Sequence, residues 1–112
     1  MKSLQQMGFK NVCGVDISPE SIRLCRQIGI ESVSLADAAN LNFCANSFDV
    51  IVASDILEHI EKDDEALKNW QRILKPNGKL LVFVPALKVL WSHHDVLNHH
   101  CRRYQKKTLV GV

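Results

Sequence analysis

Polar side chains follow two apolar stretches of this sequence, at positions where they could bind a ligand. Asp16 comes directly after Val12–Val15, and Ser54 and Asp55 come directly after Phe48–Ala53. Open α/β sheets bind ligands just outside the carboxyl ends of their strands, where a carboxylate can accept hydrogen bonds from both hydroxyls of a ribose. The two junctions therefore predict a nucleoside-binding site, with the alternative that Asp16 is a turn residue helping to cap a helix.

A third junction has the same form. Asp37 and Ala38 follow the short stretch Ser32–Leu35. A carboxylate beside a backbone amide offers an acceptor for the exocyclic amine of adenine and a donor for a ring nitrogen. An ordinary loop aspartate is the alternative. Three junctions that meet at one edge of a sheet are a more specific signal than any one of them.

The stretches between these junctions predict two helices. Ser18 is placed to cap a helix that begins at Pro19 and ends before Gly29. A second helix is predicted over about residues 62–74 because apolar residues recur there at helical spacing. These residues are Ala66, Leu67, Trp70, Ile73 and Leu74.

The apolar stretches predict strands. Leu80–Val84 adds a fourth strand to the three named above, and the turn before it contains Gly78, which permits a positive φ. Leu80–Val84 is apolar throughout. Because the strands alternate with helices, they predict an α/β fold with a parallel sheet of about four strands. The sheet is expected to be buried on both faces by flanking helices, within one domain of residues 1–112.

Composition excludes several classes of protein. The net charge of +2 is too small to predict a nucleic-acid partner. The longest apolar run, Leu80–Val84, is far shorter than the roughly 20 residues of a membrane span. Cys13, Cys25, Cys44 and Cys101 form no C-x-x-C pair, which predicts reduced thiols in a cytoplasmic protein. Cys13 and Cys25 are expected to pack in apolar surroundings.

Three blocks of the sequence resemble a class I S-adenosylmethionine-dependent methyltransferase of the broad group called type 11. The blocks read GVDISPESI, SLADAANLNFCANSFDVIVASDILEHI and LKNWQRILKPNGKLLVFVPA. The resemblance covers nearly the whole chain. It implies a Rossmann-like sheet, S-adenosylmethionine as the cofactor, and transfer of a methyl group to a small molecule.

The resemblance also implies roles for the three junctions. The first would bind the ribose and pack on the adenine ring, the second would bind the adenine edge, and the third would line the methionine end. The implied cofactor-binding residues are Asp16, Ile17, Asp37, Ala38, Ser54 and Asp55. The segment from residue 90 to 104 is similar to one that lies over the substrate side in a bacterial subset of the group. Its matching positions are His94, Asp95, His100, Arg103 and Tyr104.

No residue is identified as catalytic, and His59 is the candidate general base because imidazole titrates near neutral pH. Its alternative role is to cap a helix or to bond a backbone carbonyl. The run Asp55-x-x-Glu58-His59 resembles a divalent-ion site of a few methyltransferases. Ordinary loop roles explain these side chains and the histidines near residue 100, so no metal is expected.

Family members open with a strand and a turn of the type acidic-x-Gly-x-Gly-x-Gly, which this sequence lacks. The chain is therefore expected to be a fragment, without that turn and without the C-terminal strands, and impaired in cofactor binding. The alternative is a non-catalytic remnant or accessory subunit. A nicotinamide-dinucleotide domain would also need a glycine fingerprint and fits less well. Uncharged strand edges, such as Val50–Ala53, predict a homo-oligomer, most simply a two-fold dimer.

Overall fold

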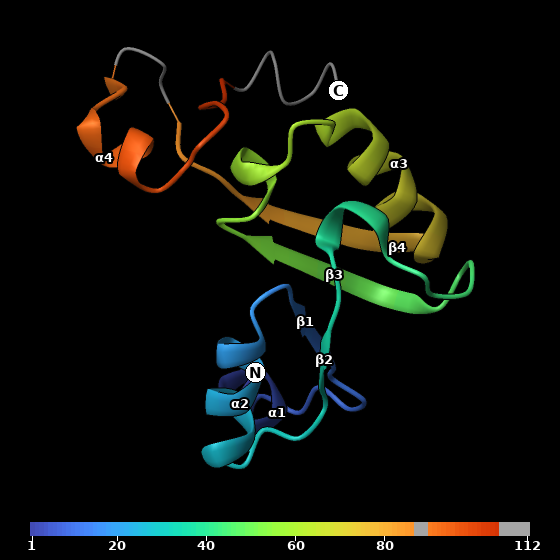
Figure 1. The fold of residues 1–112 in the computed structure, drawn as a ribbon. Helices are drawn as coiled ribbons and strands as arrows, with labels where there is room; N and C mark the ends of the chain where they lie inside the picture. The colour runs from blue at the N-terminus through green and yellow to red at the C-terminus, as the bar shows by residue number, and fades with distance from the viewer. Residues whose placement is uncertain (87–89, 106–112) are drawn as a thin grey trace. The chain divides into compact units, whose positions relative to one another are not determined.

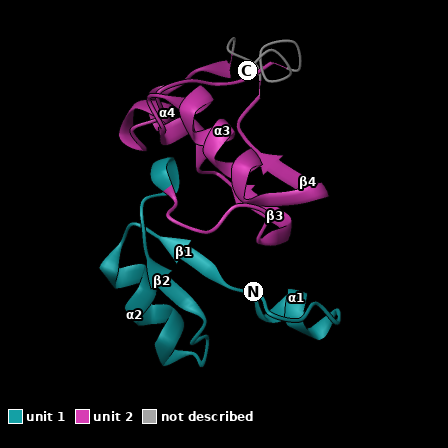
Figure 2. Cartoon of the chain, turned by 90° about the vertical axis from the view of Figure 1, so that its right-hand side faces the viewer, with its two compact units in different colours: residues 1–40 teal, residues 41–112 magenta. Residues whose placement is uncertain are grey.

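The computed structural model describes residues 1–86 and 90–105 of the 112. The chain forms two compact units, residues 1–40 and residues 41–112 (Figure 2). Each unit contains two parallel strands joined through a helix, as β-α-β connections require. No helix in the described ranges is long and apolar enough to cross a membrane.

Unit 1 is a small β-α-β element preceded by a short helix. Its elements are α1 (Lys2–Gln6), β1 (Gly14–Asp16), α2 (Pro19–Gln27), β2 (Val33–Leu35) and the 3-10 turn η1 (Ala38–Asn40). Strand β1 pairs in parallel with β2. The predicted cap is confirmed: the Ser18 side chain accepts a hydrogen bond from the Ser21 amide at 3.2 Å. Ile22 of α2 and Val33 of β2 are buried, whereas Cys13, expected to pack, is exposed.

Unit 2 is a longer β-α-β element with a further segment after it. Its elements are β3 (Phe48–Ser54), the 3-10 turn η2 (Leu57–His59), α3 (Asp63–Ile73), β4 (Leu74–Phe83) and α4 (His93–Leu97). Helix α3 lies along one face of the β3–β4 pair (Figure 1). The predicted apolar stripe forms its inner side, where Ala66, Trp70 and Ile73 are almost fully buried. The core of unit 2 therefore lies between α3 and this sheet.

The predicted α/β class with parallel strands is confirmed, but the single four-stranded sheet is not. Within the described residues, β1 pairs only with β2 and β3 pairs only with β4, which gives two sheets of two strands. The local pattern of strand, helix and strand determines each β-α-β element. It does not determine how two such elements pair with each other.

The expected burial of the strands on both faces is wrong for β3 and β4. The parallel register places Val52 beside Leu81 on the same face, and the side chains of this face are exposed. Its apolar members are Val50, Val52, Leu81 and Phe83, which are between 39% and 57% exposed. Alternating residues such as Ala53 are buried instead. An apolar run thus predicts the strand, whereas the neighbouring elements decide how many of its faces are covered.

The predicted turn at residues 75–78 lies inside β4 as an irregularity. Phe48 pairs with Leu74 and Val50 pairs with Lys79, so four residues of β4 bulge out of register. Asn77, not Gly78, has the positive φ, of 65°. Gly78 is needed for another reason, because a Cβ there would lie 2.9 Å from the Lys75 carbonyl oxygen.

Candidate functional site

The first group of predicted cofactor residues lies at the carboxyl edge of the β1–β2 pair. Asp16 ends β1, and its carbonyl accepts a hydrogen bond from the Ala36 amide at 3.0 Å. Its side-chain Oδ1 accepts from the Ser18 amide at 2.8 Å, so Asp16 has the turn role considered as its alternative. A carboxylate has a second oxygen for a ligand, and the neighbouring Ile17 is 70% exposed. The turn role and a ribose-binding role are therefore compatible.

Asp37 follows β2 at the same edge. Its Oδ1 accepts a hydrogen bond from the Ala39 amide at 2.8 Å, and its carbonyl accepts one from the Asn40 amide. These bonds start the turn η1, whose first residue is Ala38. Because β1 and β2 are parallel and in register at their ends, Asp16 and Asp37 follow the same edge of one sheet. Unit 1 thus presents two carboxylates and an exposed apolar side chain there.

The second group lies at the carboxyl end of β3 in unit 2. The Asp55 amide donates to the Phe83 carbonyl at 2.9 Å, which extends the β3–β4 pairing by one residue. Asp55 has a φ of 54°, in the left-handed region that non-glycine residues adopt at a cost. The Ser54 hydroxyl donates to Asp55 Oδ2 at 2.8 Å, and both residues are exposed. Strained backbone at the end of a strand is typical of functional loops.

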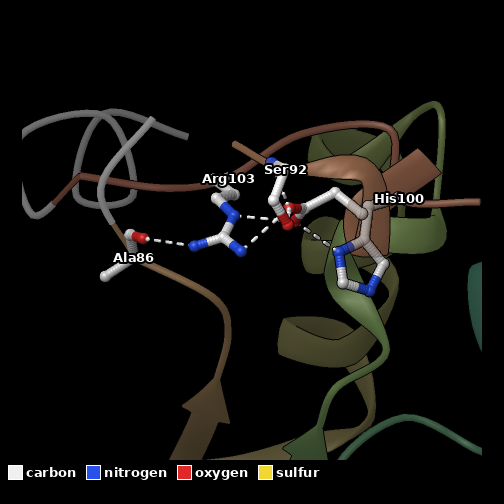
Figure 3. A network of polar contacts seen from close by, with 5 residues as sticks. Ala86, Ser92, His100 and Arg103 are labelled. Atoms are coloured by element: carbon white, nitrogen blue, oxygen red, sulfur yellow. Dashed lines mark hydrogen bonds and ion pairs between the residues drawn. The ribbon is translucent and has the colours of Figure 1, made fainter. Parts of the chain in front are cut away.

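Asp95 is the centre of a polar network in the segment after β4 (Figure 3). Its carboxylate, fully buried, accepts two hydrogen bonds from Arg103: from Nε at 2.6 Å and from Nη2 at 2.9 Å. The Ser92 amide and hydroxyl donate to Oδ2, which caps α4, and His100 Nδ1 lies 2.9 Å from Oδ1. The hydrogen bonds from Arg103 hold the pKa of Asp95 well below its usual range, and those from His100 and Ser92 lower it further. Burial raises this pKa, but by less than the bonds lower it.

A second set of contacts holds the end of this segment against η2 and α3. The Tyr104 hydroxyl donates to Asp63 Oδ2 at 2.8 Å, with the Leu57 carbonyl as a further acceptor at 3.3 Å. Arg102 pairs with the other oxygen of Asp63 at 2.6 Å. Burial raises the pKa of the Tyr104 phenol, and the hydrogen bond to Asp63 adds to this shift. The segment therefore packs on η2 and α3 within unit 2.

His59 and His100 come together at the junction of η2 and this segment. Their ring centroids are 4.8 Å apart and the rings meet edge to face. The Cys101 amide donates to the Glu58 carbonyl at 2.6 Å. Because Glu58 precedes His59 and Cys101 follows His100, this bond holds the backbones of the two histidines next to each other. Glu58 itself is fully buried. The candidate base His59 is thus exposed at one side of a histidine pair.

The structure places the predicted substrate-side residues in two clusters. Asp95, His100 and Arg103 share the first network, and Tyr104 belongs to the contacts around Asp63. His94 is exposed on α4, and within the described residues only its backbone carbonyl has a recorded bond, from the Asn98 amide. Sequence reasoning missed Ser92, although the spacing Ser-x-x-Asp is the signature of a capping box.

Sequence reasoning also missed the buried partners on the earlier segment. Asp63 lies in the predicted helix of residues 62–74 without a role of its own, and Glu58 was named only in the run Asp55-x-x-Glu58-His59. Their roles depend on residues about 40 positions later in the chain, such as Arg102 and Tyr104. No local pattern contains that information.

Comparisons with known proteins identify the family. A family model described as a methyltransferase domain, of type 11, matches residues 1–82. A ubiquinone/menaquinone biosynthesis C-methyltransferase, UbiE of Blochmanniella pennsylvanica, is 40% identical over 68 residues, which are 58% of this chain and 27% of that protein.

Solved structures extend the similarity. A SAM-dependent methyltransferase from Thermotoga maritima superposes with a TM-score of 0.73 at 24% identity, over 88% of this chain and 50% of that one. The [4+2]-cyclase SpnF superposes with a TM-score of 0.62 at 25% identity, over 77% and 35%. This chain therefore spans between about a quarter and half of the proteins that it matches. With most of its length matched by the family model, the chain belongs to the type 11 methyltransferase-domain family of class I S-adenosylmethionine-dependent enzymes.

Proposed function

We propose that this chain carries the nucleoside-binding part of a methyltransferase domain that transfers a methyl group from S-adenosylmethionine to a small molecule. The observation that carries the proposal is the edge of the β1–β2 pair, where Asp16 and Asp37 follow paired parallel strands beside the exposed Ile17. Ligands of such folds bind at this edge. Family membership supplies the choice of cofactor.

The residues present fit the nucleoside part of the cofactor. Asp16 would accept hydrogen bonds from the ribose hydroxyls through the oxygen that its turn leaves, and Ile17 would pack on the adenine ring. Asp37 and Ala38 would bind the adenine edge. When bound, the cofactor supplies an electrophilic methyl group. Ser54 and Asp55 are proposed for its methionine end.

The affinity of these 112 residues for the whole cofactor is expected to be weak. The five glycines are Gly8, Gly14, Gly29, Gly78 and Gly111, and no two are closer than six positions. No stretch of the sequence can therefore form the glycine-rich turn through which family members bring backbone amides to the methionine end. The carboxylates of unit 1 would then supply most of the binding free energy.

The methyl acceptor is proposed to be a small molecule. The relative UbiE is named for ubiquinone and menaquinone biosynthesis, which supports an acceptor of that size class. His59 remains the candidate base because it is exposed and its ring contacts His100. Asp95 and Arg103 bond each other, so we assign them a positioning role in ordering the segment that carries His100.

A non-catalytic, self-associating protein is the second candidate function. The face of β3–β4 formed by Val50, Val52, Leu81 and Phe83 supports it, because exposed apolar patches of this kind mark interaction surfaces. The similarity to the cyclase SpnF also supports a role other than methyl transfer on this fold. Sedimentation equilibrium over a wide concentration range tests this candidate. A dimer that Val52→Lys dissociates is expected, and a monomer at all concentrations would contradict it.

Calorimetric titration of the chain with S-adenosylmethionine tests the main proposal. We expect a dissociation constant weaker than about 100 μM, corresponding to less than about 5.5 kcal/mol of binding free energy. Asp16→Asn keeps an oxygen for the Ser18 amide and removes the charge, so it should weaken binding by tenfold or more.

The matched control is Glu31→Gln, which removes an equivalent charge just before the opposite, amino end of β2. It should leave the affinity within twofold of the unmodified chain. Low-micromolar affinity would refute the expected weakness. Equal affinity of the Asp16 variant and the control would show that Asp16 has only its turn role.

A further inference from the structure

The side chain of Glu58 is in an unusual environment. It is 0% exposed, and within the described residues neither of its carboxylate oxygens has a hydrogen-bonding partner. A buried carboxylate without a partner is strongly unfavourable, and native structures almost always provide one. The partner of Glu58 is therefore expected to come from outside the described residues, and a bound ion is a species that would satisfy both oxygens.

Two histidines lie next to this carboxylate. One ligand atom each from Glu58, His59 and His100 lie within 4.8 Å of one another. The ligand atoms around a tetrahedral zinc ion are about 3.4 Å apart. The cluster is therefore somewhat wider than a metal-bound one, and the exposed side chain of His59 has room to adjust.

The buried Asp95 prepares His100 to be a ligand. Its carboxylate lies 2.9 Å from His100 Nδ1 and also accepts from Arg103, and because a carboxylate is an acceptor, Nδ1 is the ring nitrogen that bonds to it. The other ring nitrogen of His100, Nε2, points away from this network and is the atom left for a ligand (Figure 3). Histidines that bind metals typically donate their other nitrogen to a carboxylate in this way.

We propose that Glu58, His59 and His100 bind one divalent transition-metal ion, and that zinc is the ion which this donor set fits best. Two imidazole nitrogens and one carboxylate oxygen are a ligand set of zinc sites that keep a fourth position open. The ion neutralises the buried Glu58. It also connects the turn η2, which follows β3, to a segment about 40 residues later in the chain.

The proposed site differs from the expectation drawn from the sequence, which was that the chain binds no metal. It also differs from the run Asp55-x-x-Glu58-His59 that suggested a metal, because Asp55 is not part of the cluster. His100 replaces it, held by a carboxylate that no local pattern connects with Glu58. With His59 exposed, the fourth position can hold water or an oxygen atom of a small-molecule ligand.

Zinc titration of the whole chain, treated first with a chelator, tests the proposal. Competition with a coloured zinc indicator should give one ion per chain with a submicromolar dissociation constant. The melting temperature should rise by about 5–10 °C in excess zinc, because the ion binds only the folded chain. Cobalt(II) should give the intense visible absorption of a four-coordinate site.

Variants identify the ligands. Glu58→Gln, His59→Ala and His100→Gln should each weaken zinc binding by at least tenfold. His59→Ala is informative even if the buried substitutions impair folding, because His59 is exposed and its recorded ring contact is with His100 alone among the described residues. The matched control is His94→Ala, an exposed histidine on α4 outside the cluster, which should bind zinc within twofold of the unmodified chain.

Two results would overturn the proposal. The first is no binding to the unmodified chain at about 100 μM zinc, which would mean that a proton or water satisfies Glu58. The second is unchanged affinity in His59→Ala together with a loss in His94→Ala, which would place the ion on surface histidines.

Discussion

Ionisation of Tyr104 should unfold the contacts that hold the C-terminal segment on unit 2. The phenol is 4% exposed and donates to Asp63 Oδ2 at 2.8 Å. Burial and this bond both raise its pKa above the ordinary value of 10. The folded state therefore prefers the protonated phenol. Its contribution to the free energy of unfolding is fully present below pH 10 and is lost as the pH rises through the native pKa.

The magnitude follows from the bond that is lost. A hydrogen bond to a charged group contributes about 1.5–3 kcal/mol. Asp63 keeps its pair with Arg102 and the bond from the Asp64 amide, so we expect the lower end of this range for Tyr104→Phe. About 1.5 kcal/mol corresponds to a fall of about 6–12 °C in the melting temperature of a domain of this size.

The assay is simple because the chain has one tyrosine. Absorbance at the phenolate band during an alkaline titration reports Tyr104 alone. The native chain should titrate at least one pH unit above the urea-unfolded chain, and each unit corresponds to 1.36 kcal/mol of preferential stabilisation. A native midpoint equal to that of the unfolded chain, while circular dichroism still shows the folded state, would refute the reasoning.

Two further substitutions test other parts of unit 2 by urea unfolding. Arg103→Gln should lower the urea midpoint strongly, because it leaves the buried Asp95 with fewer hydrogen-bond donors. The control is Arg23→Gln in the exposed pair with Glu20, which should change the midpoint little. Equal effects would contradict a buried network. Gly78→Ala should destabilise by about 1–3 kcal/mol because its Cβ would press on backbone oxygens, whereas Asn77→Gly should be nearly neutral at its positive φ. A neutral Gly78→Ala would mean that the bulge in β4 can shift.

The elements of the fold could be predicted from the sequence because their signals are local. Ser18 before Pro19 gives the start of α2, and the stripe that includes Trp70 gives α3. The positions of Asp16 and Asp37 after their strands follow from the same local patterns. Most boundaries moved by one or two residues, as is usual where a cap or the last pair of a ladder decides them. The exception is β4, which was predicted to begin at Leu80 and begins at Leu74, because the predicted turn lies inside it.

The remaining features depend on contacts between distant segments. The pairing of strands into two sheets and the exposed face around Val52 are set by which elements lie beside each strand. The burial of Glu58 and the donors around Asp95 arise where the segment after β4 folds back on η2. The chemistry of the imidazole ring made His59 and His100 candidate site residues in the sequence. Only the folded chain shows that they lie beside the carboxylates of Glu58 and Asp95.

Nuclear magnetic resonance of the isotope-labelled chain titrated with adenosine tests the central claim most directly. The claim is that the edge of the β1–β2 pair binds the nucleoside of the cofactor. Saturable shifts are expected to be largest at the amides of Ile17 and Ala38, with a dissociation constant in the high-micromolar to millimolar range, and they should be lost in Asp16→Asn. Titration to about 5 mM adenosine detects binding with a free energy of about 3 kcal/mol or more. The absence of shifts up to that concentration would contradict the claim. Shifts confined to other parts of the chain would contradict it equally.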